Sequence, residues 1–524
     1  MFTARCSALL GALLTLAPVA GWTASPANAS TASSPERFSI CQFVIEGNTL
    51  VASERLLAGL APYVGDAKDD SALAQAREAV LRAYREAGYE MVSVAVPPSA
   101  GTDGVVRLRV HETRIGKVSV SGNEHFSVDG LRAALPALKE HESTNLLRLS
   151  RQLFLVNDNP SRQVALAFTP GENGTADVAV KVADEPPLKM AVSLDNTGTH
   201  ATGHARATLL ATHVNLWDAG HEVAASYTTS PTNVGQVRQF GFSYLIPLPA
   251  LGDRLHLSYI HSNTDAGRVA DIFNVAGQGT TVGLRYQHYM HRTANVRHIL
   301  ELGVDDKHYE NMIDFFGNDL GVDVDARPVT LAYQYSARKA NISLAGSLGY
   351  SRNVSGGKRN DDATYDASRS GATASWNLWR AYLDYRTGAP SQWGYHAVLE
   401  GQYSNDALIS GEQFGLGGAR SVRGFPERES SGDRGWRLTN EVLTPSLADQ
   451  HRFLGFIDGG RQSRVRVLPG EASSEALISY GLGWRWTVGR SMISALDWAR
   501  VVNGTPGTRQ GHQAVHFSAV WRFI

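Results

Sequence analysis

The sequence contains little cysteine and no excess of charge of either sign. Its 524 residues include two cysteines, Cys6 and Cys41, so a disulfide framework cannot support the fold. The formal net charge is -1, and 19% of the residues are charged. Without a basic surplus, nothing indicates nucleic-acid binding. Cys41 lies in a strand-like segment, where we expect a small buried side chain.

Long apolar runs are also missing, except at the N-terminus. There, Arg5 precedes an apolar stretch from Cys6 to Ala20, and Ala27-Asn28-Ala29 follows it. This pattern is typical of a secretory signal peptide over residues 1–29, because the stretch is too short to span a membrane. Cleavage after Ala29 would leave Cys41 as the remaining cysteine, so we expect no intramolecular disulfide.

No later segment contains the roughly 18 consecutive apolar residues that a transmembrane helix needs. Beyond residue 186 the chain is instead rich in glycine and aromatic residues in alternating segments. Gln236–Ile246 and Ile478–Val488 place apolar or aromatic side chains at every second position. Such alternation is typical of a transmembrane β-barrel, whose closed ring of strands leaves no backbone group unpaired in lipid.

Residues 186–524 contain sixteen such segments, which predicts a membrane all-β fold with a 16-stranded transmembrane β-barrel. The predicted strands are 187–196, 204–215, 220–230, 235–246, 252–263, 277–289, 296–309, 326–338, 340–354, 371–386, 392–405, 435–444, 451–461, 475–487, 490–501 and 514–524.

Two small α+β modules are predicted before the barrel, over residues 37–112 and 113–185. Each has the order strand, two helices, two strands, and Gly47-Asn48 recurs 75 residues later as Gly122-Asn123. In the first module, Ser53 is expected to cap a short helix. A second helix there would bury one stripe of side chains, namely Leu73, Ala76, Val80 and Tyr84.

A long loop over residues 406–434 separates two predicted strands. It carries the compact tip Val422-Arg423-Gly424-Phe425, in which the glycine permits a sharp turn. An arginine so placed favours a carboxylate, because its planar guanidinium forms paired hydrogen bonds. A candidate carboxylate occurs in the segment Phe456-Ile457-Asp458-Gly459-Gly460. On a barrel strand Asp458 and Phe456 share a face, so a lumen-facing Asp458 could receive Arg423.

These two motifs resemble the BamA/TpsB superfamily of outer-membrane protein transporters, and in particular its two-partner secretion (TpsB) branch of ShlB/FhaC/HecB-like haemolysin secretion/activation proteins. The resemblance implies that the loop folds into the lumen and that Arg423 and Asp458 form a lock. Its predicted members are Arg423, Asp458, Val422, Gly424, Phe425, Phe456 and Gly460. The two N-terminal modules likewise resemble periplasmic POTRA domains, which in this family capture an unfolded client by strand addition.

The last predicted strand resembles the C-terminal signal read by the barrel-assembly machinery. Phe517, Trp521 and Phe523 alternate with polar residues, although Ile524 follows the final aromatic residue. Between Ser30 and Phe38 the sequence leaves no room for the plug helix that several TpsB transporters carry. We therefore expect either that this loop and other loops close the lumen, or that the pore conducts more at rest.

Other functions find less support in the sequence. Four histidines, His200, His204, His213 and His221, cluster in the first predicted hairpins. They form no i, i+4 pair on a predicted helix and have no accompanying carboxylates, so no metal site is predicted. The segment around Ser347 matches a hydrolase elbow only loosely and has no helix after it. We predict no enzymatic activity and no cofactor. A factor that inserts other barrels into the membrane remains the alternative, and a passive porin ranks third.

The predicted function is secretion of an unfolded exoprotein through the barrel. The partners implied by the resemblance are a TpsA-type exoprotein (a haemolysin, an adhesin or a contact-dependent toxin), outer-membrane lipid, and the barrel-assembly machinery during biogenesis, with no nucleic acid. The implied location is the Gram-negative outer membrane, with the POTRA domains in the periplasm.

Overall fold

A computed structural model describes residues 37–523, apart from 97–102, 200–201, 265–266, 270–272, 276–277, 311–313, 316–317, 320 and 468. The predicted signal peptide and Ile524 lie outside the described residues. The chain divides into two compact units. One contains Met1–Ala83 and Val94–His111, and the other contains Tyr84–Ser93 and Glu112–Ile524.

The first module is an α+β fold, as predicted. Its three-stranded sheet has the order β2-β5-β4, with β2 parallel to β5, and a separate pair joins β1 to β3. The predicted stripe of the long helix is buried. The elements are β1 (Phe38–Ile40), β2 (Gln42–Glu46), α1 (Ser53–Leu60), η1 (Ala61–Tyr63), β3 (Gly65–Lys68), α2 (Asp70–Glu86), β4 (Val92–Ala95) and β5 (Val105–Glu112).

Two local predictions in this module were wrong. Cys41 is exposed, because the strand-like segment breaks there into β1 and β2. Ser53 does not cap α1. The N-cap is Ala52, which has no side-chain bond, and Ser53 Oγ accepts a hydrogen bond from Asn48 Nδ2 instead (3.0 Å).

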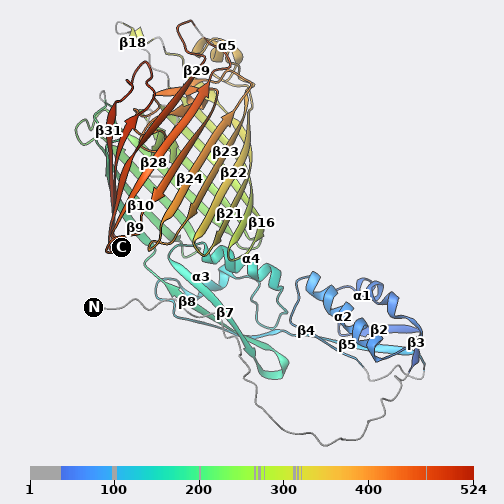
Figure 1. The fold of residues 1–524 in the computed structure, drawn as a ribbon. Helices are drawn as coiled ribbons and strands as arrows, with labels where there is room; N and C mark the ends of the chain where they lie inside the picture. Colours follow the sequence, from blue (N-terminus) through green and yellow to red (C-terminus); the bar gives the residue numbers. More distant parts are fainter. Residues whose placement is uncertain are drawn as a thin grey trace, which may run out of the picture. The chain divides into compact units, whose positions relative to one another are not determined.

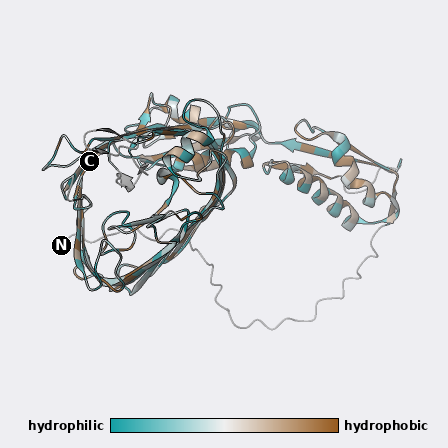
Figure 2. Cartoon of the chain, turned by 90° about the horizontal axis from the view of Figure 1, so that it is seen from above, coloured by the Kyte–Doolittle hydropathy of each residue, from teal (hydrophilic) through white to brown (hydrophobic). Residues whose placement is uncertain are grey.

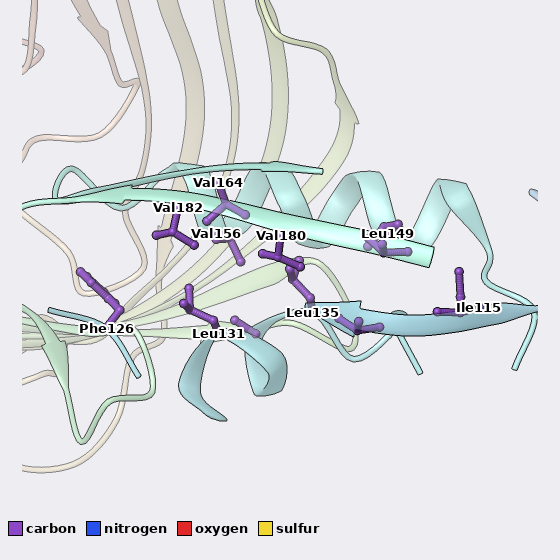
Figure 3. Packing of buried hydrophobic residues seen from close by; sticks show 12 residues of the cluster. Ile115, Phe126, Leu131, Leu135, Leu149, Val156, Val164, Val180 and Val182 are labelled. Carbon is purple, nitrogen blue, oxygen red and sulfur yellow. The ribbon is translucent and has the colours of Figure 1, made fainter. Parts of the chain in front are cut away.

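The second module repeats this plan. Its sheet has the order β6-β8-β7. Figure 3 shows Val180 and Val182 of the sheet and Leu131 and Val156 of the helices pointing into one apolar core. In the described part of the chain, no helix is long and apolar enough to cross a membrane. The elements are β6 (Ile115–Ser121), α3 (Val128–Ala134), α4 (Leu146–Asn157), β7 (Arg162–Pro170), η2 (Glu172–Gly174) and β8 (Ala176–Asp184).

The internal repeat predicted from the two Gly-Asn pairs is present in the backbone. Gly47 and Gly122 both have φ of 83°, and a Cβ on either would lie within 2.4 Å of a carbonyl oxygen of the neighbouring strand. The amide groups of Asn48 and Asn123 each donate to the carbonyl three residues ahead, at 3.0 and 2.8 Å. Only glycine fits such a turn, which is why the pair recurs.

The remaining chain forms a closed antiparallel β-barrel of sixteen strands within the described residues (Figure 1). Pairing of β31 with β9 closes the ring, which Figure 2 shows from above. The strands are β9 (Leu188–Asp195), β10 (Arg206–Leu216), β11 (His221–Thr229), β12 (Gln239–Leu248), β13 (Asp253–Ser262), β16 (Gly279–Arg292), β17 (Val296–Tyr309), β21 (Pro328–Lys339), β22 (Ile342–Asn353), β23 (Asn377–Thr387), β24 (Gly394–Tyr403), β27 (Arg434–Leu443), β28 (His451–Ser463), β29 (Ser474–Val488), β30 (Met492–Val501) and β31 (Gln513–Phe523).

All sixteen predicted strands are present. The largest difference lies at predicted strand 371–386, because β23 begins only at Asn377. The residues before it instead follow the short helix α5 (Asp362–Ser368) and pack with it, as Trp376 and Tyr365 show. Shorter strands lie in the loops and pair with each other outside the ring. The exception is β20, which precedes β21 and, like it, pairs with β17. They are β14 (Gly267–Val269), β15 (Phe273–Val275), β18 (Asp314–Phe315), β19 (Asn318–Asp319) and β20 (Val324–Ala326).

One buried carboxylate ties the second module to the barrel. Asp158, which follows α4, pairs with Arg254 Nη2 (2.9 Å), Arg297 Nη2 (3.3 Å) and Arg292. These arginines lie at one end of β13, β17 and β16. Burial alone would raise the pKa of Asp158, but the three guanidinium groups lower it, so the carboxyl group is ionised. The contact holds α4 against the strand ends.

Leu482→Lys is expected to reduce the free energy of unfolding of the barrel by about 2–4 kcal/mol. Leu482 lies in the middle of β29 and is 65% exposed, so a lysine would place charge in the lipid. Denaturant unfolding in lipid vesicles measures the change. The control is Val467→Lys, in the loop between β28 and β29. An equal loss in both variants would contradict the lipid-facing assignment.

Candidate functional site

The predicted loop 406–434 folds back on itself between β24 and β27. It begins with a 3-10 turn, η3 (Ser410–Glu412), and then forms a short hairpin of β25 (Phe414–Leu416) and β26 (Ser430–Gly432). The tip Val422-Arg423-Gly424-Phe425 lies between the two strands of this hairpin and is buried. We call residues 404–433 the lumen loop.

Arg423 and Asp458 lie in direct contact. Arg423 Nε donates to Asp458 Oδ2 at 2.7 Å, and Nη2 donates to Oδ1 at 3.0 Å, so the pair is bidentate. The backbone N–H of Arg423 also donates to Asp458 Oδ2 (3.2 Å). Asp458 is 0% exposed and its neighbour Ile457 is 61% exposed. The carboxylate therefore faces the lumen, and Ile457 faces the outside of the barrel.

Two further carboxylates surround the same guanidinium. Arg423 Nη1 donates to Glu441 Oε1 at 2.8 Å and to Asp497 Oδ2 at 3.4 Å. Burial alone would lower the pKa of Arg423, but the bond to Asp458 and the charges of Glu441 and Asp497 raise it above its ordinary value. The arginine therefore stays charged in a site that excludes most water.

Phe456 lies flat against the same group. The Arg423 Cζ atom is 3.4 Å from the centroid of the Phe456 ring, within the range of a cation–π contact. Phe456 and Asp458 share the inner face of β28, as the alternation predicted. One face of the guanidinium is thus covered by a ring while its edges are bound by carboxylates.

The other predicted members of the site shape the tip. Val422 and Phe425 pack in an apolar cluster with Leu477 and Val501. Gly424 has φ of 94°, and its N–H donates to His516 Nε2 at 3.0 Å. A Cβ on Gly460 would lie 2.8 Å from Leu416 Cδ2, so this glycine makes room for the hairpin of the loop.

The sequence analysis missed Glu441, Asp497 and His516. Asp497 carries the pattern that identified Asp458, a carboxylate between the apolar residues Leu496 and Trp498 of an alternating strand. Glu441 follows the predicted loop and belongs to β27. Alternation alone shows which face each residue takes, not that β27, β30 and β31 place them around one arginine.

The predicted assembly signal lies on the outer face of the closing strand. Phe517, Trp521 and Phe523 are exposed, and β31 pairs with β9 through Trp521 with Val192 and Phe523 with Met190. Recognition of these residues by the barrel-assembly machinery stays a prediction.

Beside the lumen loop lies a cavity of about 1300 Å³. Its wall carries both signs of charge, with Arg285, Glu301 and Asp305 on one side and Glu400 and Arg437 on another. The lumen wall beside the loop therefore presents charged groups of both signs.

Within the described ranges, no group of three or more histidine, cysteine, aspartate or glutamate residues is placed to hold a metal ion. Of the four histidines considered from the sequence, His200 lies outside the described residues. His221 Nδ1 is 2.6 Å from the hydroxyl oxygen of Tyr244.

The fold and the lumen loop together define a class of protein, the outer-membrane β-barrels that carry POTRA modules and hold a long loop inside the barrel. Residues 174–486 match the family model "Haemolysin secretion/activation protein ShlB/FhaC/HecB", and residues 38–113 match "POTRA domain, ShlB-type". The chain belongs to the ShlB/FhaC/HecB family of two-partner secretion transporters. It is an outer-membrane protein whose POTRA domains lie in the periplasm, and members of this family are transporters rather than enzymes.

Curated relatives cover most of the chain. The outer membrane transporter CdiB of Dickeya dadantii is 24% identical over 497 residues, 89% of this chain and 85% of its own length. The hemolysin transporter protein ShlB of Serratia marcescens is 24% identical over 508 residues, 91% of this chain and 83% of its own. Solved CdiB from Escherichia coli has a similar fold, with a TM-score of 0.71 at 18% identity, covering 95% of this chain and 93% of that one.

Gly424→Ala is expected to loosen the tip. An alanine at φ of 94° costs about 1–2 kcal/mol, and its Cβ would lie 3.3 Å from both Ala499 and Val501. The Arg423–Gly424 bond should then be cut faster by trypsin in the folded protein. Gly470→Ala is the control, because Gly470 has φ of 88° but open space around it. Cleavage at the same rate as in the wild type would show that the tip tolerates the side chain.

Proposed function

We propose that this chain recognises an unfolded TpsA-type exoprotein through its POTRA domains and secretes it through the barrel. The observation that carries the proposal is the lumen loop, whose tip is held inside the wall by Arg423 and Asp458. Those bonds connect a loop to a strand. Their release would therefore let the loop move while the strands of the barrel stay paired in a closed ring. The residues of the tip would then act as a reversible lock.

Capture of the client would use the edges of the two POTRA sheets. In the first module β2 and β4 are the outer strands, and in the second β6 and β7 are. Backbone hydrogen bonds along an edge bind any extended chain with little regard to its sequence, which suits an unfolded client. Since the periplasm supplies no nucleotide, folding of the client outside the cell would provide the free energy. Relatives are named as hemolysin and heme/hemopexin transporters, which favours an exoprotein as cargo.

A barrel-insertion factor is the alternative, and one observation favours it. The fold is also similar to BamA from Haemophilus ducreyi, with a TM-score of 0.52 at 12% identity. Co-expression with a TpsA-type exoprotein separates the two functions. Release of the client into the medium only when this chain is present supports transport. Unchanged release, together with depletion of other surface barrels, supports insertion.

Arg423→Ala is expected to give a folded, inserted barrel that secretes at least tenfold less client. The change leaves the buried Asp458 without its cation, at a local cost of about 3–5 kcal/mol, whereas Glu441 and Asp497 keep Arg485 nearby. Client in the medium is measured beside heat-modifiable migration of the barrel on gels. Arg509→Ala, in an exposed loop, is the matched control. Normal secretion by Arg423→Ala would remove this residue from the mechanism.

A further inference from the structure

The lumen loop has a second buried ionic contact at its base, near the point where the loop leaves β24. Glu412 of η3 is 1% exposed, and three donors from two strands reach it. Lys307 Nζ and the Tyr309 hydroxyl, both on β17, donate to Oε1 at 2.7 and 2.8 Å. Arg380 Nη2, on β23, donates to Oε2 at 3.0 Å. Burial alone would raise the pKa of Glu412, but the two cations lower it to about 2, so it is ionised.

The backbone around Glu412 is shaped for this position. A Cβ on Gly411 would lie 2.3 Å from the Tyr309 ring, so only glycine allows the backbone to lie against that ring. Gln402 Nε2 donates to the backbone carbonyl of Glu412 at 2.9 Å. Contacts from β17, β23 and β24 therefore fix the main chain as well as the carboxylate.

The two ionic contacts use different strands of the ring. Glu412 binds Lys307 on β17 and Arg380 on β23. Arg423 binds Glu441 on β27, Asp458 on β28 and Asp497 on β30. The segment from Glu412 to Arg423 thus connects two groups of strands in the barrel wall.

The two ends differ in what surrounds them. Next to Glu412, Leu408 and Ile409 lie in a large apolar cluster with Tyr309, Tyr365 and Trp376. Asp433, fully buried where the loop ends, accepts the N–H of Leu408 (2.9 Å) and pairs with Arg369. The apolar cluster at the tip, which contains Val422 and Phe425, is smaller. The base of the loop is thus the more firmly embedded end.

From this geometry we propose that Glu412 is a positioning residue that fixes the base of the lumen loop to β17 and β23 while the tip is released. The inference rests on the proposed function for the role of tip release. The loop then moves as an arm attached at Glu412, and the two contacts open independently of each other.

Hydrogen exchange of the whole protein in detergent tests this independence. Glu412→Gln keeps the shape of the side chain and removes its charge. We expect faster exchange in the peptides around residues 404–416 and unchanged exchange around 419–427, whereas Arg423→Ala should give the reverse pattern. Glu400→Gln is the matched control, because Glu400 pairs with Arg437 in the lumen wall. It should change neither region.

Two outcomes would overturn the inference. Exchange in Glu412→Gln equal to that of the wild type would show that the contact does not hold the base. Faster exchange at the tip in the same variant would show that the loop is released as one unit.

Secretion is measured in parallel. Glu412→Gln should secrete at least tenfold less client than the wild type, with unchanged heat-modifiable migration. Normal secretion by this variant would also overturn the inference. If the wild type itself secretes nothing, the proposed function fails, and the exchange patterns still decide whether Glu412 is an independent anchor.

Discussion

The structure depends on the closure of its sheet. In lipid each backbone N–H and C=O needs a protein partner, and an open sheet would leave two edges without one. Pairing of β31 with β9 removes both edges. Once the ring is closed, alternate side chains face either lipid or lumen, so the polar residues of every strand are gathered into one interior. The charged lumen is a direct consequence of that closure.

A lumen of this kind has to be occupied, and the lumen loop is the segment that occupies part of it. Its tip brings one cation to Asp458, Glu441 and Asp497, which would otherwise repel one another in a confined space. Arg485 on β29 and His396 on β24 approach the same carboxylates from the wall. The site therefore combines strands distant in sequence with a loop, and withdrawal of the tip would leave three carboxylates with one arginine instead of two.

Sequence reasoning predicted the fold well because barrel strands carry a period-2 signal along the chain. The module repeat was equally visible, since the turn at Gly47 and Gly122 admits only glycine. The Arg423–Asp458 pair was predicted from the two motifs that contain these residues. Glu412 was not, because nothing near it in sequence marks a carboxylate whose partners, Lys307 and Arg380, come from β17 and β23. The predictions for Cys41 and Ser53 failed for local reasons: the strand breaks at Cys41, and the Ser53 hydroxyl bonds to Asn48 instead of capping the helix.

The chemistry of the two ends of the loop accounts for which end can move. At the tip, Arg423 and its carboxylates lost hydration when they were buried, and water returns to them when the tip leaves. The net cost of release is therefore much smaller than the strength of the individual bonds. At the base, Leu408 and Ile409 would gain no such compensation, because exposing apolar surface to water is unfavourable throughout. Both ends carry an ion pair and apolar contacts, but the apolar cluster at the base is larger than the cluster at the tip. The base is therefore the end that opens less readily. A plug loop needs this division if it is to open while remaining attached to the barrel.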